Sequence, residues 1–100
     1  MNGIDPEKLE VIHDTEAHRF EVRLEDDVAF VEYQKAGNNM VFVHTEVPVA
    51  FEGLGIASKM AKVALDYARD NGHKIQAVCP FITAYIRRHT EYQPITWGYF

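Results

Sequence analysis

Length, composition and charge restrict this sequence to one globular domain of ordinary make-up. Its 100 residues leave no room for a second hydrophobic core, so residues 1–100 are predicted to form a single domain. Hydrophobic residues make up 47% of the chain and charged residues 25%, which excludes a disordered or low-complexity protein. The formal net charge of -5 is opposite in sign to that of a nonspecific nucleic-acid binder, so no nucleic-acid partner is expected.

Three features of the sequence favour the cytoplasm. No apolar run is long enough to cross a bilayer, so no membrane association is expected. The first ten residues carry Asp5, Glu7 and Glu10 and lack the apolar centre of a secretory signal. Cys79 is the only cysteine, so no disulfide can form within the chain.

The first half of the chain alternates between apolar and polar residues, as half-buried strands do. Strands are predicted over residues 18–24, 28–33 and 40–45, with turns between them, and residues 4–15 fit either a strand or a loop. The third strand places Met40, Phe42 and His44 on one face and Val41, Val43 and Thr45 on the other. Because both faces are apolar, this strand is predicted to be central and covered on both sides.

The second half of the chain changes to a helical period. Apolar residues at helical spacing predict a helix that ends at Asn71 and Gly72: Ile56, Met60, Val63, Ala64, Tyr67 and Ala68. A short strand over 74–79 and a second helix over 80–89 follow. For residues 90–100 a turn and a short strand are expected, with Trp97, Tyr99 and Phe100 packed on the sheet or forming a partner surface. The predicted fold is α+β, a mixed sheet of antiparallel N-terminal strands followed by a βαβ unit and a C-terminal helix.

A glycine-containing loop joins the third predicted strand to the long helix. Glu52-Gly-Leu-Gly-Ile-Ala directs backbone N–H groups toward the helix start, where anions bind favourably. The loop is therefore a phosphate-binding candidate, although a strand-to-helix turn can need glycine for its own sake. It lacks the lysine of a P-loop, and Ser58 replaces the third glycine of the dinucleotide-binding fingerprint.

Two side chains near the expected carboxyl ends of the parallel strands can carry chemistry. Cys79 precedes Pro80, so it is predicted to cap the second helix, where the helix dipole favours a thiolate. His44 lies near the end of the third strand, and we expect it to meet Cys79 at one edge of the sheet. A buried apolar cysteine and a core histidine are the alternative interpretations. The other histidines show no metal-ligand spacing, so no metal site is predicted.

Taken in order, these motifs resemble a known family. His44-Thr-Glu-Val-Pro, Glu52-Gly-Leu-Gly-Ile-Ala, Cys79-Pro-Phe, Tyr85-Ile-Arg-Arg-His and Glu91-Tyr92 are similar to the small, single-domain branch of the GNAT superfamily of acetyl-CoA-dependent N-acetyltransferases. The resemblance covers most of the chain and is strongest over residues 44–92.

The resemblance implies that acetyl-CoA lies in a cleft between the strand of His44 and the strand of Cys79. Backbone N–H groups of the loop would bind its pyrophosphate; the loop residues are Glu52, Gly53, Leu54, Gly55, Ile56 and Ala57. The backbone of Thr45 and Val47 would pair with the pantetheine arm. Ala50 stands where the family usually has arginine or glutamine, so a side-chain contact to phosphate is lost.

For catalysis the resemblance implies two routes. Either His44 acts as general base toward an incoming amine, or Cys79 accepts the acetyl group and passes it on with help from His44. Tyr85 does not match the usual tyrosine acid, Arg88 falls near that position, and the roles of Tyr85, Arg87 and Arg88 stay open. The expected acceptor is a small amine, a polyamine or a lysine. The protein itself is expected to be a monomer or a weak dimer. The alternatives are an acyl-CoA-binding module with little turnover and an interaction protein.

Overall fold

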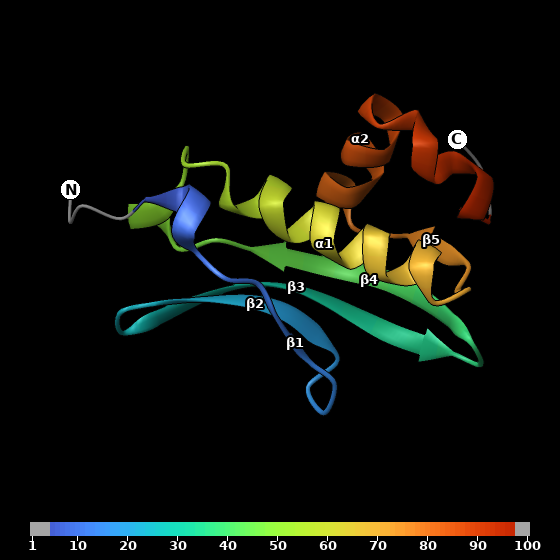
Figure 1. The fold of residues 1–100 in the computed structure, drawn as a ribbon, viewed down its shortest axis with the longest axis horizontal. Coiled ribbons are helices and arrows are strands. Elements are labelled where there is room, and N and C mark those ends of the chain that lie inside the picture. The colour runs from blue at the N-terminus through green and yellow to red at the C-terminus, as the bar shows by residue number, and fades with distance from the viewer. Residues whose placement is uncertain (1–4, 98–100) are drawn as a thin grey trace.

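Four antiparallel strands in chain order build most of the sheet in this computed structural model, which describes residues 5–97 (Figure 1). They are β1 (Ile12–Asp14), β2 (Arg19–Leu24), β3 (Asp27–Ala36) and β4 (Asn39–Glu46). A fifth strand, β5 (Ile75–Ala77), pairs parallel to β4 and completes the order β1-β2-β3-β4-β5. The predicted α+β fold with a mixed sheet is confirmed.

Helices follow the last two strands and lie on the same side of the sheet (Figure 1). The crossover from β4 to β5 is α1 (Ile56–Asp70), and α2 (Pro80–Arg88) follows β5. Three 3-10 turns complete the described chain: η1 (Pro6–Lys8), η2 (Val49–Phe51) and η3 (Thr90–Ile95). Neither α-helix within residues 5–97 combines the length and hydrophobicity that a bilayer crossing requires.

The core lies between α1 and the strands β2, β3 and β4. The helix contributes six buried residues, namely Ile56, Met60, Ala61, Ala64, Leu65 and Ala68. Val63, which the helical spacing included, is instead 37% exposed. The three alanines of this stripe allow the helix to lie close to the sheet.

Within residues 5–97 no helix covers the other face of the sheet, so the prediction that β4 is covered on both sides is wrong. Along β4, Val41 and Val43 are half-buried while His44 and Glu46 are exposed. Apolar residues on both faces of a strand therefore do not require two covering layers, because neighbouring side chains on the same face shelter one another.

The C-terminal segment packs against α1 and β5. Thr96 forms a parallel bridge with Ile75, and the Trp97 N–H donates to the Ile75 carbonyl at 2.8 Å. The Trp97 side chain is 40% exposed. Tyr99 and Phe100, which were expected to pack nearby, lie outside the described residues.

A buried tyrosine anchors this segment to α1. The Tyr92 hydroxyl donates a hydrogen bond of 2.6 Å to Asp66, and Lys62 and Arg69 form ion pairs with the same carboxylate. Burial opposes ionisation of Asp66, but these hydrogen bonds and charges outweigh it and lower the pKa of the carboxyl. Burial and the Asp66 contact raise the pKa of Tyr92, so its hydroxyl stays protonated as a donor.

We therefore expect Tyr92→Phe to lower the free energy of unfolding by about 1–2 kcal/mol, because a hydrogen bond from a buried hydroxyl to a half-buried carboxylate is lost. Urea denaturation measures the change. Tyr85→Phe is the matched control: Tyr85 is also buried, and the described structure gives its hydroxyl no hydrogen bond. Equal destabilisation by the two variants would contradict this account.

The half-buried imidazole of His13 predicts how the free energy of unfolding depends on pH. The His13 ring stacks on Phe20 at 4.1 Å, and its Nε2 lies 2.6 Å from the Tyr33 hydroxyl. Burial lowers the pKa of His13 below its usual 6.5, the charge of Asp14 opposes this shift, and that of His18 adds to it. The unfolded chain thus takes up this proton more readily than the folded protein does.

The free energy of unfolding is therefore expected to fall as the pH is lowered through about 6.5. Urea denaturation at a series of pH values between about 5 and 8 measures the slope. In His13→Gln the contribution of this group disappears, so the variant has a flatter profile over this range. Parallel profiles for the two proteins would contradict the assignment.

Candidate functional site

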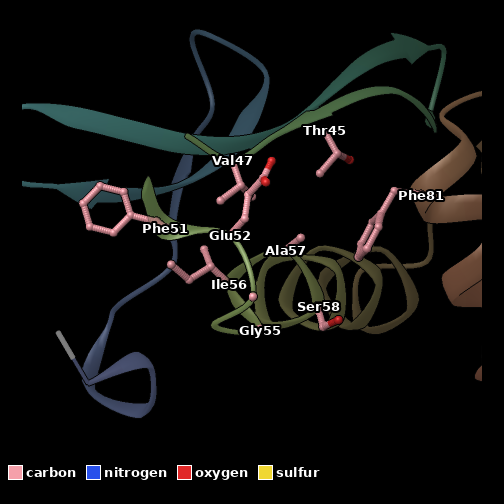
Figure 2. Close-up of a pocket in the computed structure, with 10 residues that line it drawn as sticks. Thr45, Val47, Phe51, Glu52, Gly55, Ile56, Ala57, Ser58 and Phe81 are labelled. Atoms are coloured by element: carbon pink, nitrogen blue, oxygen red, sulfur yellow. The ribbon is translucent and has the colours of Figure 1, made fainter. Parts of the chain in front are cut away.

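A cavity of about 350 Å³ lies between β4, the loop before α1, and α2 (Figure 2). Phe51 stands at one end, and Thr45 and Phe81 stand at the other. Its lining comprises Thr45, Val47, Phe51, Glu52, Gly53, Gly55, Ile56, Ala57, Ser58 and Phe81. These include seven of the eight residues predicted to bind the cosubstrate; the eighth, Leu54, packs against the hydrophobic core instead.

The loop conformation depends on its two glycines. Gly53 and Gly55 have φ angles of 84° and 80°, which side-chain-bearing residues rarely adopt. Gly55 is the N-cap of α1 and supplies no capping side chain. The first N–H groups of a helix have no acceptor within the helix, so those at the start of α1 can serve a ligand in the cavity.

Two side chains of the loop modify this anion-binding potential. The carboxylate of Glu52 points from the loop toward β4 (Figure 2), so an anion must bind through the backbone away from it. Ala50 is exposed in η2 and has no polar group to offer. Phe51, Ser58 and Phe81 also line the cavity, although the sequence motifs did not predict them as binding residues.

The second feature of the site is the separation of β4 from β5. Their pairing ends at Phe42 and Ala77, and the N–H groups of Val78 and Cys79 both donate to the Phe42 carbonyl, at 2.9 and 3.0 Å. Beyond Phe42, β4 continues to Glu46 with β3 on one side and no strand of the described chain on the other. This free edge can receive the amides of an extended ligand as an added strand would.

Cys79 stands where the strands separate. It is the N-cap of α2, with Pro80 in the first turn, as predicted. Its side chain is buried, with 4% exposure, and its Sγ lies 3.2 Å from the Thr45 hydroxyl. Because Thr45 lines the cavity, the thiol sits directly behind the cavity wall.

A β-bulge determines where His44 and Thr45 point. Glu32 pairs with His44 and Tyr33 pairs with Phe42, so Val43 has no partner on β3. The extra residue reverses the alternation of β4, and Thr45 faces the core beside the fully buried Val31.

His44 consequently lies on the uncovered face of the sheet. Its ring is 5.7 Å from that of Phe30, and its Nε2 is 3.1 Å from Glu46 Oε1. The predicted meeting of the imidazole and the Cys79 thiol on one side of the sheet is therefore wrong. The prediction assumed strict alternation along residues 40–45 and did not include the bulge. Because Val43 is the extra residue, the side chains that follow it lie on the opposite face from the one predicted.

Tyr85, Arg87 and Arg88 of α2 are not among the residues that line the cavity. Tyr85 is buried and stacks on His89 at 3.9 Å, and burial raises the pKa of its hydroxyl. Arg87 and Arg88 are exposed in the last turn of α2, at the end opposite to Cys79. No group of three or more metal-ligating side chains that could hold an ion is found within residues 5–97.

Comparisons with known proteins agree with this architecture. Protein NATD1 of Xenopus tropicalis is 36% identical over 93 residues, which cover 89% of this chain and 85% of the relative. Human protein NATD1 is 37% identical over 84 residues, covering 81% of this chain and 74% of the relative.

A solved structure shares the fold. An NMR structure of a GCN5-like candidate N-acetyltransferase from Staphylococcus aureus superimposes with a TM-score of 0.68 at 25% identity, covering 92% of this chain and 91% of the other. Residues 19–95 match the family description "GCN5-related N-acetyl-transferase". This chain therefore belongs to the family of GCN5-related N-acetyltransferases.

Proposed function

We propose that this protein transfers the acetyl group of acetyl-CoA to an amine. The observation that supports this most is the cavity itself. It begins at the N–H groups of the first turn of α1 and continues along the free edge of β4 to the Thr45 hydroxyl, behind which the Cys79 thiol lies. Acetyl-CoA carries an anionic pyrophosphate and, at the end of its pantetheine arm, a thioester, and this order of groups matches the order of the features along the cavity.

In this proposal the backbone N–H groups of residues 52–57 bind the pyrophosphate of acetyl-CoA. The free backbone edge at Thr45 and Val47 pairs with the pantetheine amides. An N–H near Val47 polarises the acetyl carbonyl and stabilises the oxyanion that forms on it. Acetyl-CoA supplies an activated acyl group, and the chain supplies its orientation.

In the proposed chemistry, Cys79 and His44 act from opposite sides of the sheet on an acetyl group that lies where β4 and β5 separate. The Cys79 thiolate attacks the acetyl carbon, the C–S bond to CoA breaks, and the CoA thiolate leaves and takes up a proton. The acceptor amine next attacks the acetyl-cysteine, its proton passes to a base, and the Cys79 thiolate departs. His44, oriented by Glu46, is the proposed base for an amine that arrives at the uncovered face.

Direct transfer remains the simpler variant of this function. In it, His44 removes the proton as the amine attacks acetyl-CoA itself, and Cys79 only shapes the site. The acceptor is in both variants a cationic amine, in keeping with the net charge of -5 and the exposed carboxylates of Glu32 and Glu46 beside His44.

A second candidate function is an acyl-CoA-binding module with little turnover. Two observations favour it: Ala50 gives the phosphates no side-chain contact, and the Cys79 thiol is only 4% exposed. The two functions share acetyl-CoA binding and differ in the fate of the acetyl group.

Two measurements test these functions. Isothermal titration calorimetry with acetyl-CoA is expected to give a dissociation constant below about 1 mM, an affinity of at least about 4 kcal/mol. Release of the CoA thiol is then followed with a polyamine, a small primary amine and a lysine peptide. Turnover that depends on the amine supports the transferase, and binding without turnover supports the binding module. The absence of binding at millimolar acetyl-CoA would exclude both.

A further inference from the structure

The bulge in β4 brings a hydroxyl to the only thiol of the chain. Without the extra residue at Val43, Thr45 would point to the uncovered face, away from Cys79. With it, Thr45 Oγ1 lies 3.2 Å from Cys79 Sγ, at the end of the cavity where Figure 2 shows Thr45. The bulge thus has a local chemical consequence as well as a geometric one.

The backbone of Cys79 is held on both sides, so the position of its sulfur is well defined. Its N–H donates to the Phe42 carbonyl at 3.0 Å. Its carbonyl accepts hydrogen bonds from the Thr83 N–H at 3.0 Å and the Thr83 hydroxyl at 3.1 Å. The side chain does not cap α2, which leaves the sulfur available for Thr45.

The ionisation state of Cys79 determines which atom donates the hydrogen bond between the Thr45 hydroxyl and the Cys79 sulfur. While the thiol is protonated, either atom can be the donor. A thiolate has no proton, so the Thr45 hydroxyl must then donate to it. A hydrogen bond to an ionised acceptor is stronger than one between neutral groups, so loss of the Thr45 hydroxyl is expected to cost the ionised sulfur more than the neutral one.

We propose that Thr45 is a positioning residue for Cys79: its hydroxyl holds the sulfur directly behind the cavity wall and stabilises the thiolate. The role of the Thr45–Cys79 pair in acetyl transfer rests on the proposed function. The stabilisation of the thiolate by Thr45 does not, because it can be measured without acetyl-CoA.

The test compares the ionisation of Cys79 in three proteins. Because Cys79 is the only cysteine, ultraviolet thiolate absorbance and the rate of alkylation by iodoacetamide each report this one sulfur. In Thr45→Val the hydroxyl is lost with little change in shape. We expect the pH midpoint of both signals to rise, with roughly three- to tenfold less thiolate at a pH below the midpoint. Thr45→Ser, which keeps the hydroxyl, is expected to restore most of the wild-type profile.

Thr83→Val is the matched control, because its hydroxyl bonds to the carbonyl of the same cysteine and not to the sulfur. Its pH midpoint is expected to stay near that of the wild type. Superimposable profiles for Thr45→Val and the wild type would overturn the inference, whatever the transfer activity. If Thr45→Val is too unstable to titrate, Thr45→Ala replaces it, with the same expected rise. A raised midpoint in a protein that never forms acetyl-cysteine supports the inference and counts against the proposed transfer through Cys79.

Discussion

Replacing Cys79 with alanine is expected to abolish acetyl transfer while acetyl-CoA still binds with nearly unchanged affinity. The cavity that would hold the coenzyme is built by β4, the glycine loop and α2, and it does not depend on the sulfur. The thiol, in contrast, is the proposed acceptor of the acetyl group, and removal of a nucleophile typically lowers turnover by roughly three orders of magnitude or more. Calorimetry measures the binding and CoA thiol release measures the turnover.

Intact-mass spectrometry after incubation with acetyl-CoA alone gives an independent readout. With a single cysteine in the chain, an acetyl adduct in the wild type that is absent from Cys79→Ala identifies the modified residue. His44→Ala separates the two routes. If Cys79 carries the acetyl group, this variant still forms the adduct but passes it slowly to the amine. Full turnover in Cys79→Ala would exclude the cysteine route, and loss of turnover only in His44→Ala would favour direct transfer.

Local patterns in the sequence predicted β2 to β5 and both α-helices in the right order, whereas the segment that contains β1 was left open between a strand and a loop. The alternation over residues 18–24 corresponds to β2, and the helical spacing after Gly55 corresponds to α1, which ends just before Asn71 and Gly72 as predicted. Pro80 marks the first turn of α2, with Cys79 as its N-cap. These features depend on backbone preferences and on periodic burial, which a single sequence records directly.

Features that depend on pairing between distant residues were less accessible. Nothing in the run Asn39–Glu46 marks Val43 as unpaired, because the bulge is defined by its register with Glu32 and Tyr33 of β3. The bond from Tyr92 to Asp66 joins residues 26 positions apart, and the sequence gives no periodic sign of it. The predicted loop residues other than Leu54 therefore line the cavity, and their binding of the cosubstrate stays a prediction, whereas the predicted face of His44 is wrong.

Adding a methyl group to the loop glycines is expected to weaken acetyl-CoA binding by about tenfold or more, that is by at least about 1.4 kcal/mol. Gly53 and Gly55 line the cavity with positive φ angles, and an added Cβ at either would meet no protein atom within 4 Å. The protein therefore tolerates the methyl group sterically, but the left-handed backbone costs about 1–2 kcal/mol for a residue with a side chain. Relief of that strain would move the N–H groups that are proposed to hold the pyrophosphate, and the methyl group would occupy the space of the ligand.

Two other glycines provide matched controls for this experiment. Gly37 in the turn before β4 and Gly72 after α1 have φ angles of 64° and 74°, and an added Cβ there also meets nothing within 4 Å. Neither lines the cavity. Alanine at all four positions is thus expected to lower thermal stability by a similar amount, whereas only the Gly53 and Gly55 variants lose affinity for acetyl-CoA. A uniform loss of affinity across the four variants would assign the effect to general destabilisation, and unchanged affinity in Gly53→Ala and Gly55→Ala would remove the loop from the proposed binding site.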